Sequence, residues 1–333
     1  MSERELTMAE ALNEALHEEM ERDPAVFMIG EDIGRNGGLF GVSAGLLDKF
    51  GRPRVIDAPM YEAAFSGAGI GASLVGCRPV VEIQCSDFVT LMMDQIVNHA
   101  SKWHYMTGGH VKCPVVFRGP VNSGVGLAAQ HSQSFEAWFV HTPGLVVLYP
   151  STPADAKGLL KSAIRDDNPV LMLEKRLLYT RPGVIPEGEH LVPLGVADVK
   201  RSGSDVTVVG IGNGVHLGLQ AAREVARDGI DVEVIDPRTL KPLDIDTIAE
   251  SVTKTGRLVV VSESPRACGI AGEIIARVIE AAYDSLEAQP IRITAKDTPI
   301  PYAAQLERAV LPSVEDVVSA ITTTVGHTAP AAV

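Results

Sequence analysis

Glu62 opens a stretch with no other charged residue, running from Ala63 to Val75. The stretch is rich in Gly and Ala, follows Pro59, and is predicted to be a helix. Because Gly weakens a helix, this density of Gly is expected only where another surface packs very closely. A carboxylate headed for such a surface acquires a raised pKa unless a partner holds it. Glu62 is therefore a candidate for acid–base chemistry, and not only a charge that suits the helix dipole.

His131 is the second candidate, in a polar segment after a Gly-rich run from Gly119 to Gly126. It follows a predicted strand, and open α/β sheets bind ligands beyond the carboxyl ends of their strands. Gln130, Ser132 and Gln133 could orient its ring. A catalytic role and a structural role both stay open on these facts.

A third candidate lies where Asp166, Asp167 and Asn168 end a predicted helix before Pro169. Pro disfavours helix in the residue before it, so the segment can be a simple helix stop. The alternative is a site for a hard monovalent cation, built from free helix-end carbonyls and an Asp oxygen.

Other chemistries find little support. The segment Gly210–Gly218 (GIGNGVHLG) joins a strand to a helix, and Asp236 ends the next strand, but its glycines do not have the GxGxxG spacing of a dinucleotide site. The sequence contains no GxSxG, HExxH or Walker A motif of hydrolases or kinases.

The composition narrows the class of protein. The 333 residues suffice for two domains, and a hydrophobic content of 46% favours subunit contacts. A net charge of −13 argues against nucleic acid, and neither a membrane span nor a signal peptide is expected. We predict a cytoplasmic protein whose four scattered cysteines, Cys77, Cys85, Cys113 and Cys268, are buried thiols.

The elements that must position the candidates alternate between strand and helix. A capping box at Thr7 and Glu10 starts a helix that ends at Asp23. Strands are then predicted at 26–32, 55–59, 78–83, 113–119, 145–150 and 169–175, with helices after Glu62, over 89–105 and from Pro153. A second series has strands at 205–212, 231–240, 257–264 and 290–297, with helices at 215–228 and 270–286. This alternation predicts an α/β protein with two parallel-sheet domains.

Seven segments, in this order along the chain, resemble the beta subunit of thiamine-diphosphate-dependent 2-oxo acid dehydrogenases. They are GEDIG, VIDAPMYEAAFSGAGIG, EIQCSDF, DQIVNHASKWHYMTGG, AAQHSQS, PADAKGLLKSAIRDDNPV and EVIDPRTLKPLD. The similarity extends from about Leu6 to Ile321. It implies a transketolase-like pyrimidine-binding domain over 1–182, a linker over 183–196, a transketolase C-terminal-like domain over 197–325 and a disordered tail over 326–333.

The resemblance also implies roles for particular residues. Glu62 would hydrogen-bond the pyrimidine ring of thiamine diphosphate and stabilise its imino tautomer, while Glu31 would line the same site as a second catalytic acid. Phe88 would stack on that ring, and Met60 would also contact the cofactor. His131 would act in acyl transfer to lipoamide. The resemblance further implies a structural potassium ion, held mainly by backbone carbonyls of Val115, Ala163, Ile164, Asp166 and Asn168.

The magnesium motif of thiamine enzymes, GDG followed by Asn, is not found in this sequence. The resemblance therefore implies that an alpha subunit supplies magnesium and the pyrophosphate half of the site in an α2β2 heterotetramer. This assembly would serve a lipoyl acyltransferase core in the oxidative decarboxylation of pyruvate or a branched-chain 2-oxo acid. Acetoin cleavage is the nearest alternative, and a nucleotide-dependent dehydrogenase or a non-catalytic scaffold is more distant.

Overall fold

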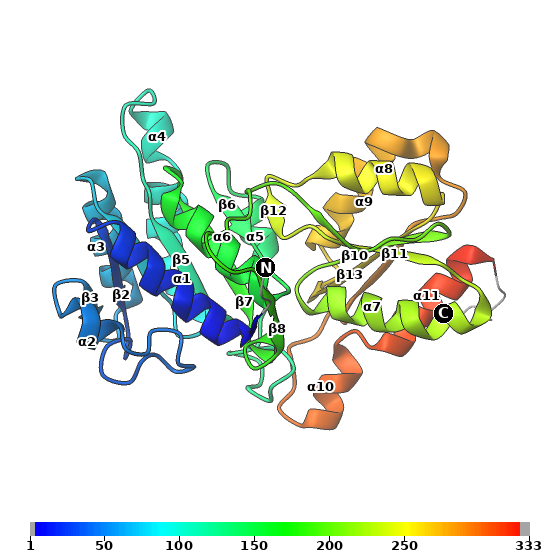
Figure 1. Ribbon diagram of the computed structural model, residues 1–333. Helices are drawn as coiled ribbons and strands as arrows, with labels where there is room; N and C mark the ends of the chain where they lie inside the picture. The colour runs from blue at the N-terminus through cyan, green and yellow to red at the C-terminus, as the bar shows by residue number, and fades with distance from the viewer. Residues whose placement is uncertain (1–3, 327–333) are drawn as a thin grey trace. The chain divides into compact units, whose positions relative to one another are not determined.

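The computed structural model describes residues 4–326, which form two compact units (Figure 1). Unit 1 contains the chain through Asn122 together with Trp138–Leu194 and Leu240–Pro242. Unit 2 contains Ser123–Ala137, Gly195–Thr239 and the chain from Leu243 onward. Two short segments thus belong to a different unit from the residues that flank them. The tail predicted over 326–333 lies outside the described residues, apart from Gly326.

Unit 1 is built on a seven-stranded sheet of order β12-β6-β7-β5-β4-β2-β3. The strands are β2 (Val26–Gly30), β3 (Val55–Asp57), β4 (Arg78–Glu82), β5 (Val116–Val121), β6 (Val146–Leu148), β7 (Val170–Lys175) and β12 (Thr239–Lys241). All neighbouring pairs among the six strands other than β12 are parallel. Parallel strands end at a common edge, so the residues that follow β2, β3 and β4 lie near one another.

Helices cover both faces of this sheet. Along β4, Val80 packs in the core that α1 (Met8–Arg22) and α6 (Pro153–Arg165) share. The next residue, Val81, points to the opposite face, where α3 (Glu62–Leu74) packs so closely that a Cβ on Gly69 would lie 2.7 Å from Val81 Cγ2. This alternation follows from the two-residue period of a strand. Shorter helices are α2 (Leu46–Phe50), α4 (Trp103–Met106) and α5 (Glu136–Val140).

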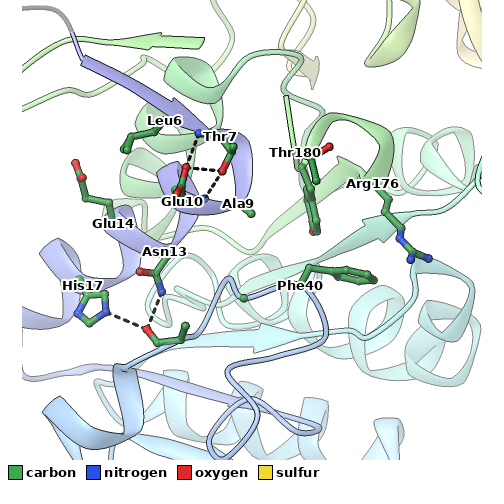
Figure 2. Close-up of a pocket in the computed structure, with 13 residues that line it drawn as sticks. Leu6, Thr7, Ala9, Glu10, Asn13, Glu14, His17, Phe40, Arg176 and Thr180 are labelled. Carbon is green, nitrogen blue, oxygen red and sulfur yellow. Dashed lines mark hydrogen bonds between the residues drawn. The ribbon is translucent and has the colours of Figure 1, made fainter. Parts of the chain in front are cut away.

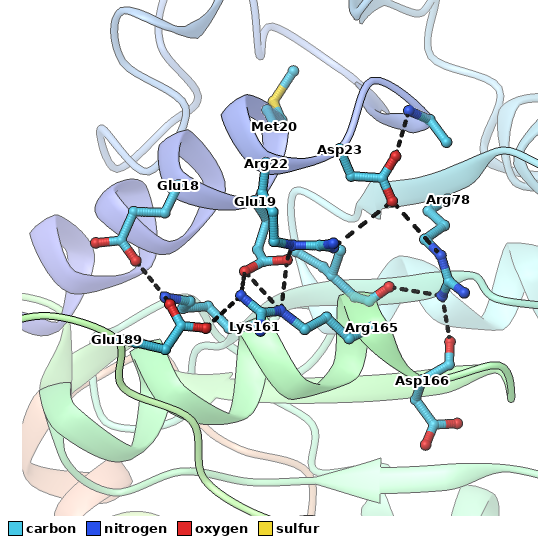
Figure 3. A network of polar contacts seen from close by, with 12 residues as sticks. Glu18, Glu19, Met20, Arg22, Asp23, Arg78, Lys161, Arg165, Asp166 and Glu189 are labelled. Atoms are coloured by element: carbon cyan, nitrogen blue, oxygen red, sulfur yellow. Dashed lines mark hydrogen bonds and ion pairs between the residues drawn. The ribbon is translucent and has the colours of Figure 1, made fainter.

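Ion pairs link α1 to α6 (Figure 3). Both oxygens of Glu18 bind lysines of α6, at 2.7 Å from Lys157 Nζ and 2.5 Å from Lys161 Nζ. The next residue of α1, Glu19, pairs at 2.6 Å with Arg165, which lies one turn beyond Lys161 on α6. The two lysines and Glu19 are almost fully buried, which is tolerated because each charge has a partner. The predicted capping box at Thr7 and Glu10 is confirmed at the start of α1.

The prediction of one continuous α-helix over 89–105 is wrong. The chain instead makes a 3-10 helix (Ser86–Met92), a π-helix (Asp94–Ala100) and the short α4. The hydroxyl groups of Ser101 and Thr107 donate to the carbonyls four residues earlier, at 2.8 Å each, and such bonds weaken and bend a helix. The linker predicted over 183–196 begins within a strand, β8 (Pro182–Ile185), which pairs antiparallel with β1 (Arg4–Thr7).

Unit 2 has a five-stranded sheet of order β14-β13-β10-β11-β9. Its strands are β9 (Asp198–Arg201), β10 (Val206–Gly210), β11 (Val232–Asp236), β13 (Leu258–Pro265) and β14 (Ile291–Ala295), and only β9 pairs antiparallel. Figure 1 shows α7 (Asn213–Val225) and α11 (Val314–Val325) on one face, with α8 (Ile245–Thr255) and α9 (Ile270–Ala282) on the other. The helix α10 (Ala304–Val310) precedes α11.

Close packing accounts for the glycines between β10 and α7. A Cβ on Gly210 would lie 2.3 Å from the Val215 nitrogen, and one on Gly214 would lie 2.5 Å from the Val261 carbonyl oxygen. These contacts support a tight strand-to-helix turn as the reason for the GIGNG pattern. The cysteine prediction was correct for Cys85 and Cys113, which are buried, but wrong for Cys268, which is exposed, and Cys77 is half-buried.

An ionic group is buried inside unit 1. Arg118 is 1% exposed and donates to Glu174, with Nε 2.7 Å from Oε1, and also to Glu82 on the neighbouring strand. The Tyr179 hydroxyl also donates to Glu174. Burial raises the pKa of Glu82, and the nearby Glu174 raises it further, while Arg118 opposes both effects. One guanidinium therefore holds two buried carboxyl groups in place.

Replacing Arg118 by Met is expected to lower the free energy of unfolding of the chain by roughly 3–5 kcal/mol, because two buried carboxyl groups lose their cation. The deficit should grow as pH rises above about 4.5, because loss of Arg118 raises the pKa of buried Glu82 further, and the unfolded chain then ionises at a lower pH than the folded chain. Urea denaturation at several pH values measures it. Lys49→Met, which removes an exposed ion pair with Glu21, is the control and should leave the free energy of unfolding almost unchanged. A pH-independent deficit would contradict the expectation.

Candidate functional site

Glu62 is the first residue of α3 and is half-buried. The turn that leads to it is held at the end of β2, since the Ala58 amide donates to the Gly30 carbonyl at 2.8 Å. Tyr61 occupies the N-cap position without a side-chain cap hydrogen bond. The Glu62 carboxyl group therefore stands at the start of the helix, where the N–H dipoles favour negative charge.

Glu31 follows β2 directly and lies near Glu62. Its side chain is buried, at 5% exposure for the residue, and its Oε1 atom has no hydrogen-bond partner among the residues that the structure describes. Burial raises the pKa of Glu31, and the negative charges of Glu62 and Asp32 raise it further. The raised pKa favours the protonated form of Glu31 more than water does.

Phe88 follows β4, which pairs with β2 on the side opposite to β3. It lies in the 3-10 helix after β4, where its amide donates to the Cys85 carbonyl at 2.9 Å, and its ring is half-buried. Nearby in sequence, the Ser86 hydroxyl is buried without a hydrogen-bond partner in the described part of the chain. Met60, before the turn into α3, is 85% exposed. The ends of β2, β3 and β4 thus bring two carboxyl groups and an aromatic ring to one edge.

Cys85 is not a nucleophile in this site. Burial raises the pKa of its thiol to about 12, and a hydrogen bond and the charge of Asp87 add to this effect. The Cys85 thiol donates to an Asp87 oxygen 3.0 Å away. A neutral, hydrogen-bonded thiol has little reactivity at neutral pH.

His131 belongs to unit 2, within the segment Ser123–Ala137. It is half-buried, and the next residue, Ser132, is fully buried. The backbone before it is irregular, with left-handed φ angles at Gly124, Gly126 and Ala128. Such a conformation is uncommon for a residue with a side chain, so Ala128 marks a loop whose shape is imposed by its surroundings.

The five residues predicted for potassium surround the C-terminal end of α6. Arg78 donates to two of their carbonyls, those of Ile164 (3.0 Å) and Asp166 (2.9 Å). The Val115 carbonyl accepts from the Val170 amide at 2.9 Å, and Asp166 Oδ1 accepts from both nitrogens of Asn168. The fifth residue, Ala163, lies in the last turn of α6. Among the described residues, no group of three or more His, Cys, Asp and Glu side chains could hold a metal.

A pocket of about 810 Å³ lies elsewhere in unit 1 (Figure 2). It is lined by the first turns of α1, by Phe40 and by Arg176, whose guanidinium lies 4.5 Å from the centre of the Phe40 ring. Asn13 and His17 close one side through contacts with the Ala44 carbonyl. None of the site residues predicted from the sequence lines this pocket.

Three acidic residues near the His131 segment were not found from the sequence. They are Glu136, on the segment itself, Glu263 on β13 and Glu307 on α10. Burial raises the pKa of Glu136, and the charge of Glu263 raises it further, while Ser264 and Ser262 oppose the effect. Glu307 lies 181 residues from its contact at Gly126, so no local pattern could have revealed it.

Comparison with known proteins identifies the class. Residues 4–182 match the family model "Transketolase, pyrimidine binding domain", and residues 195–317 match "Transketolase, C-terminal domain". A solved structure described as "Split gene transketolase, inactive beta4 tetramer" has the same fold, with a TM-score of 0.79 at 23% identity over 96% of this chain and 98% of that one. The chain is a two-domain protein of the transketolase type, and the predicted fold class is confirmed.

Sequence relatives narrow the class further. Pyruvate dehydrogenase E1 component subunit beta of Rickettsia conorii is 47% identical over 95% of this chain and 97% of its own length. The protein of the same name from Rhizobium meliloti is 46% identical over 95% of this chain and 69% of its own length. A mitochondrial beta-2 form from Oryza sativa is 46% identical over 95% and 85%. The chain belongs to the family of pyruvate dehydrogenase E1 beta subunits, which confirms the resemblance seen in the sequence. Within residues 4–326, no helix is long and apolar enough to cross a membrane.

Exchanging Glu31 for Gln is expected to make the melting temperature of the isolated chain less sensitive to a rise in pH above about 4.5. A carboxyl group with a raised pKa in the folded state favours folding while it is protonated, and that contribution is lost as pH rises from the unfolded value through the folded one. Because Gln cannot ionise, the melting temperature of the variant should rise relative to that of the wild type as pH rises above about 4.5. Thermal melts from pH 5 to 9 test this, with the exposed Glu21→Gln as control. Parallel curves for Glu31→Gln and the wild type would contradict a raised pKa.

Proposed function

We propose that this chain is the beta subunit of a thiamine-diphosphate-dependent dehydrogenase that decarboxylates pyruvate and passes the acyl group to lipoamide. The observation that carries the proposal is the pair Glu31 and Glu62 beside Phe88 at the carboxyl edge of the unit 1 sheet. The names of the E1 beta relatives favour pyruvate over acetoin. Cleavage of acetoin has no observation of its own in its favour, and neither has the nucleotide-dependent dehydrogenase.

The residues at this edge fit the aminopyrimidine end of the cofactor. The partnerless Oε1 atom of Glu31 and the half-buried carboxyl group of Glu62 offer hydrogen-bond acceptors, and Phe88 offers a flat apolar surface. Met60 is exposed beside this turn and can complete the contact. Bound thiamine diphosphate would supply the nucleophilic carbon and the electron sink that loss of CO2 requires, which no side chain provides.

In this proposal Glu62 and Glu31 have different roles. Glu62 binds a ring nitrogen of the pyrimidine and holds the ring by a charge-assisted hydrogen bond. Glu31, whose pKa is raised by burial and by the charge of Glu62, keeps a proton that it can exchange with groups beside it. His131 is proposed to stabilise charge and move protons during acyl transfer to a lipoyl domain.

An alpha subunit is proposed as the partner, and the exposed face of α3 supports this. Ala64, Ala68 and Gly71 lie exposed along one side of the helix, and Val75 just beyond it is 83% exposed. A Cβ on Gly71 would meet no atom of this chain within 4 Å, so this chain's own packing does not require Gly there. A second chain that packs closely on α3 accounts for the small residues. The partner would supply magnesium and the pyrophosphate contacts in an α2β2 heterotetramer.

The potassium ion, the lipoyl acyltransferase core and the cytoplasmic location remain proposals. For potassium, the supporting fact is that Arg78 binds carbonyl groups at the end of α6, and that Val115, just before β5, pairs with Val170 just after the turn that holds Asn168. Arg78 already uses one lone pair of the Ile164 and Asp166 carbonyls, and each carbonyl retains a second. An ion bound there would stabilise the link between α6 and the sheet.

Replacing Glu62 by Gln in the assembled enzyme is expected to reduce turnover by about 10²–10⁴-fold, because Gln keeps the shape but loses the charge. Assembly with the alpha subunit should be unchanged, as size-exclusion chromatography can verify. Steady-state decarboxylation of pyruvate with a dye acceptor measures the loss. Glu21→Gln, an exposed change on α1, should have no effect, and near-normal activity of Glu62→Gln with bound cofactor would refute the assignment.

The isolated chain is expected to fold but to bind thiamine diphosphate weakly or not at all. Glu31, Glu62 and Phe88 reach only the pyrimidine end, and a hydrogen bond with a stacked ring contributes roughly a few kcal/mol, which the entropy cost of association offsets. Isothermal titration calorimetry with magnesium present tests this on the chain alone and after addition of the alpha subunit. Tight one-to-one binding by the chain alone would mean that the site is complete without a partner.

A further inference from the structure

The segment Ser123–Ala137, which carries His131, is fastened to unit 2 near both of its ends by acidic side chains. At the first end, the Ser123 hydroxyl donates to Glu263 Oε2 at 3.0 Å, and Asn213 Nδ2 donates to the other oxygen of Glu263 at 3.0 Å. At the far end, Glu136 is 1% exposed and its Oε1 lies 3.4 Å from the Ser262 hydroxyl. His131 lies between these two attachments.

Glu307 makes the most specific of these contacts. Its two carboxylate oxygens accept from two backbone amides of the segment, Gly124 at 2.7 Å and Gly126 at 3.0 Å. Both glycines have left-handed φ angles, +87° and +76°. Successive N–H groups that converge on one anion form a concave acceptor site in the backbone. Here the anion comes from the same chain, from α10.

Burial makes this contact strong and selective. Glu307 is only 3% exposed, so its two hydrogen bonds are little weakened by competition with water. Hydrogen bonds to a charged acceptor are shorter and stronger than neutral ones, and two of them define the orientation of the loop as well as its position. Without these hydrogen bonds the two glycines would leave the left-handed conformation easily, because Gly has many other backbone conformations available.

We propose that Glu307 is a positioning residue for His131: its carboxylate fixes the backbone of Gly124 and Gly126 and so sets where the histidine stands. The inference rests on the proposed role of His131 in acyl transfer, but the contact itself can be tested without that role. It assigns unit 2 a part in catalysis through a residue that touches neither cofactor nor substrate. Glu136 and Glu263 anchor the flanks of the same segment.

The first experiment measures the contact in the full-length chain by hydrogen exchange with mass spectrometry. Glu307→Gln replaces one acceptor oxygen by an NH2 group that repels an amide donor, and exchange of peptides covering residues 119–135 is expected to rise about tenfold or more. Glu307→Asp keeps the charge but is one methylene shorter, and an intermediate increase is expected. Glu315→Gln on the neighbouring α11, exposed and without a contact to the segment in the described structure, is the matched control.

The second experiment measures two activities of the enzyme assembled with its alpha subunit. In Glu307→Gln, kcat/KM for acylation of a lipoyl domain is expected to fall about tenfold or more, while dye-coupled decarboxylation of pyruvate changes less than about twofold. Glu307→Asp should recover part of the loss. A residue that only stabilises unit 2 would lower both activities together, in line with a lower melting temperature.

Unchanged hydrogen exchange in both Glu307 variants would overturn the proposal whatever the activities are. Faster exchange with an equal loss of both activities, or with no loss, would overturn the positioning role. If His131→Ala itself acylates the lipoyl domain normally, the proposed role of His131 is wrong, and so is a catalytic purpose for this contact. In that case the exchange data still establish the carboxylate as a structural clamp.

Discussion

The candidate site of this protein depends on two neighbouring carboxyl groups, of which Glu31 is buried and Glu62 half-buried. Among the residues that the structure describes, one oxygen of Glu31 has no hydrogen-bond partner, and Glu62 stands close enough for its charge to raise the pKa of Glu31. A buried acid without a hydrogen-bond partner is costly, so the surrounding sheet must hold it there. It does so because β2 and β3 are parallel neighbours, and their ends deliver Glu31 and the turn to Glu62 at one edge. A cost of this kind supports the proposal that Glu31 belongs to a binding site, because perturbed carboxyl groups gather at functional sites.

The same reasoning connects the site to a partner chain. The helix that begins at Glu62 packs tightly on β4 through Gly69, yet leaves Gly71 and Val75 facing outward with nothing from the described chain against them. A single helix therefore has one face built for its own sheet and another suited to a neighbour. Since Glu62 is the first residue of that helix, the proposed partner on the outer face would also remove water from the Glu62 carboxyl group.

Much of the fold followed from periodicity and from residues with strong local preferences. The capping box at Thr7, the short valine-rich strands and the stop at Asp166 all depend on neighbours within a few positions, so the sequence was sufficient to predict them. Family resemblance proposed Glu31, Glu62 and Phe88 as site residues, and parallel pairing of β2 with β3 and β4 explains why the segments that carry them follow the same edge of the sheet. The irregular helices from Ser86 to Met106 were not predicted, and two of them end where the hydroxyl groups of Ser101 and Thr107 compete for backbone carbonyls.

What the sequence could not reveal are contacts between distant positions. Residues 123–137 stand in the first half of the chain, between two strands of unit 1, yet they belong to unit 2. Nothing local marks that exchange, because Gly-rich backbone accepts many conformations and takes its shape from what it binds. Here it binds Glu307, Glu263 and the serines of β13, all far along the chain. The conformation of the segment that carries His131 thus depends on α10 and β13, which follow it in the chain by more than a hundred residues but belong to the same unit.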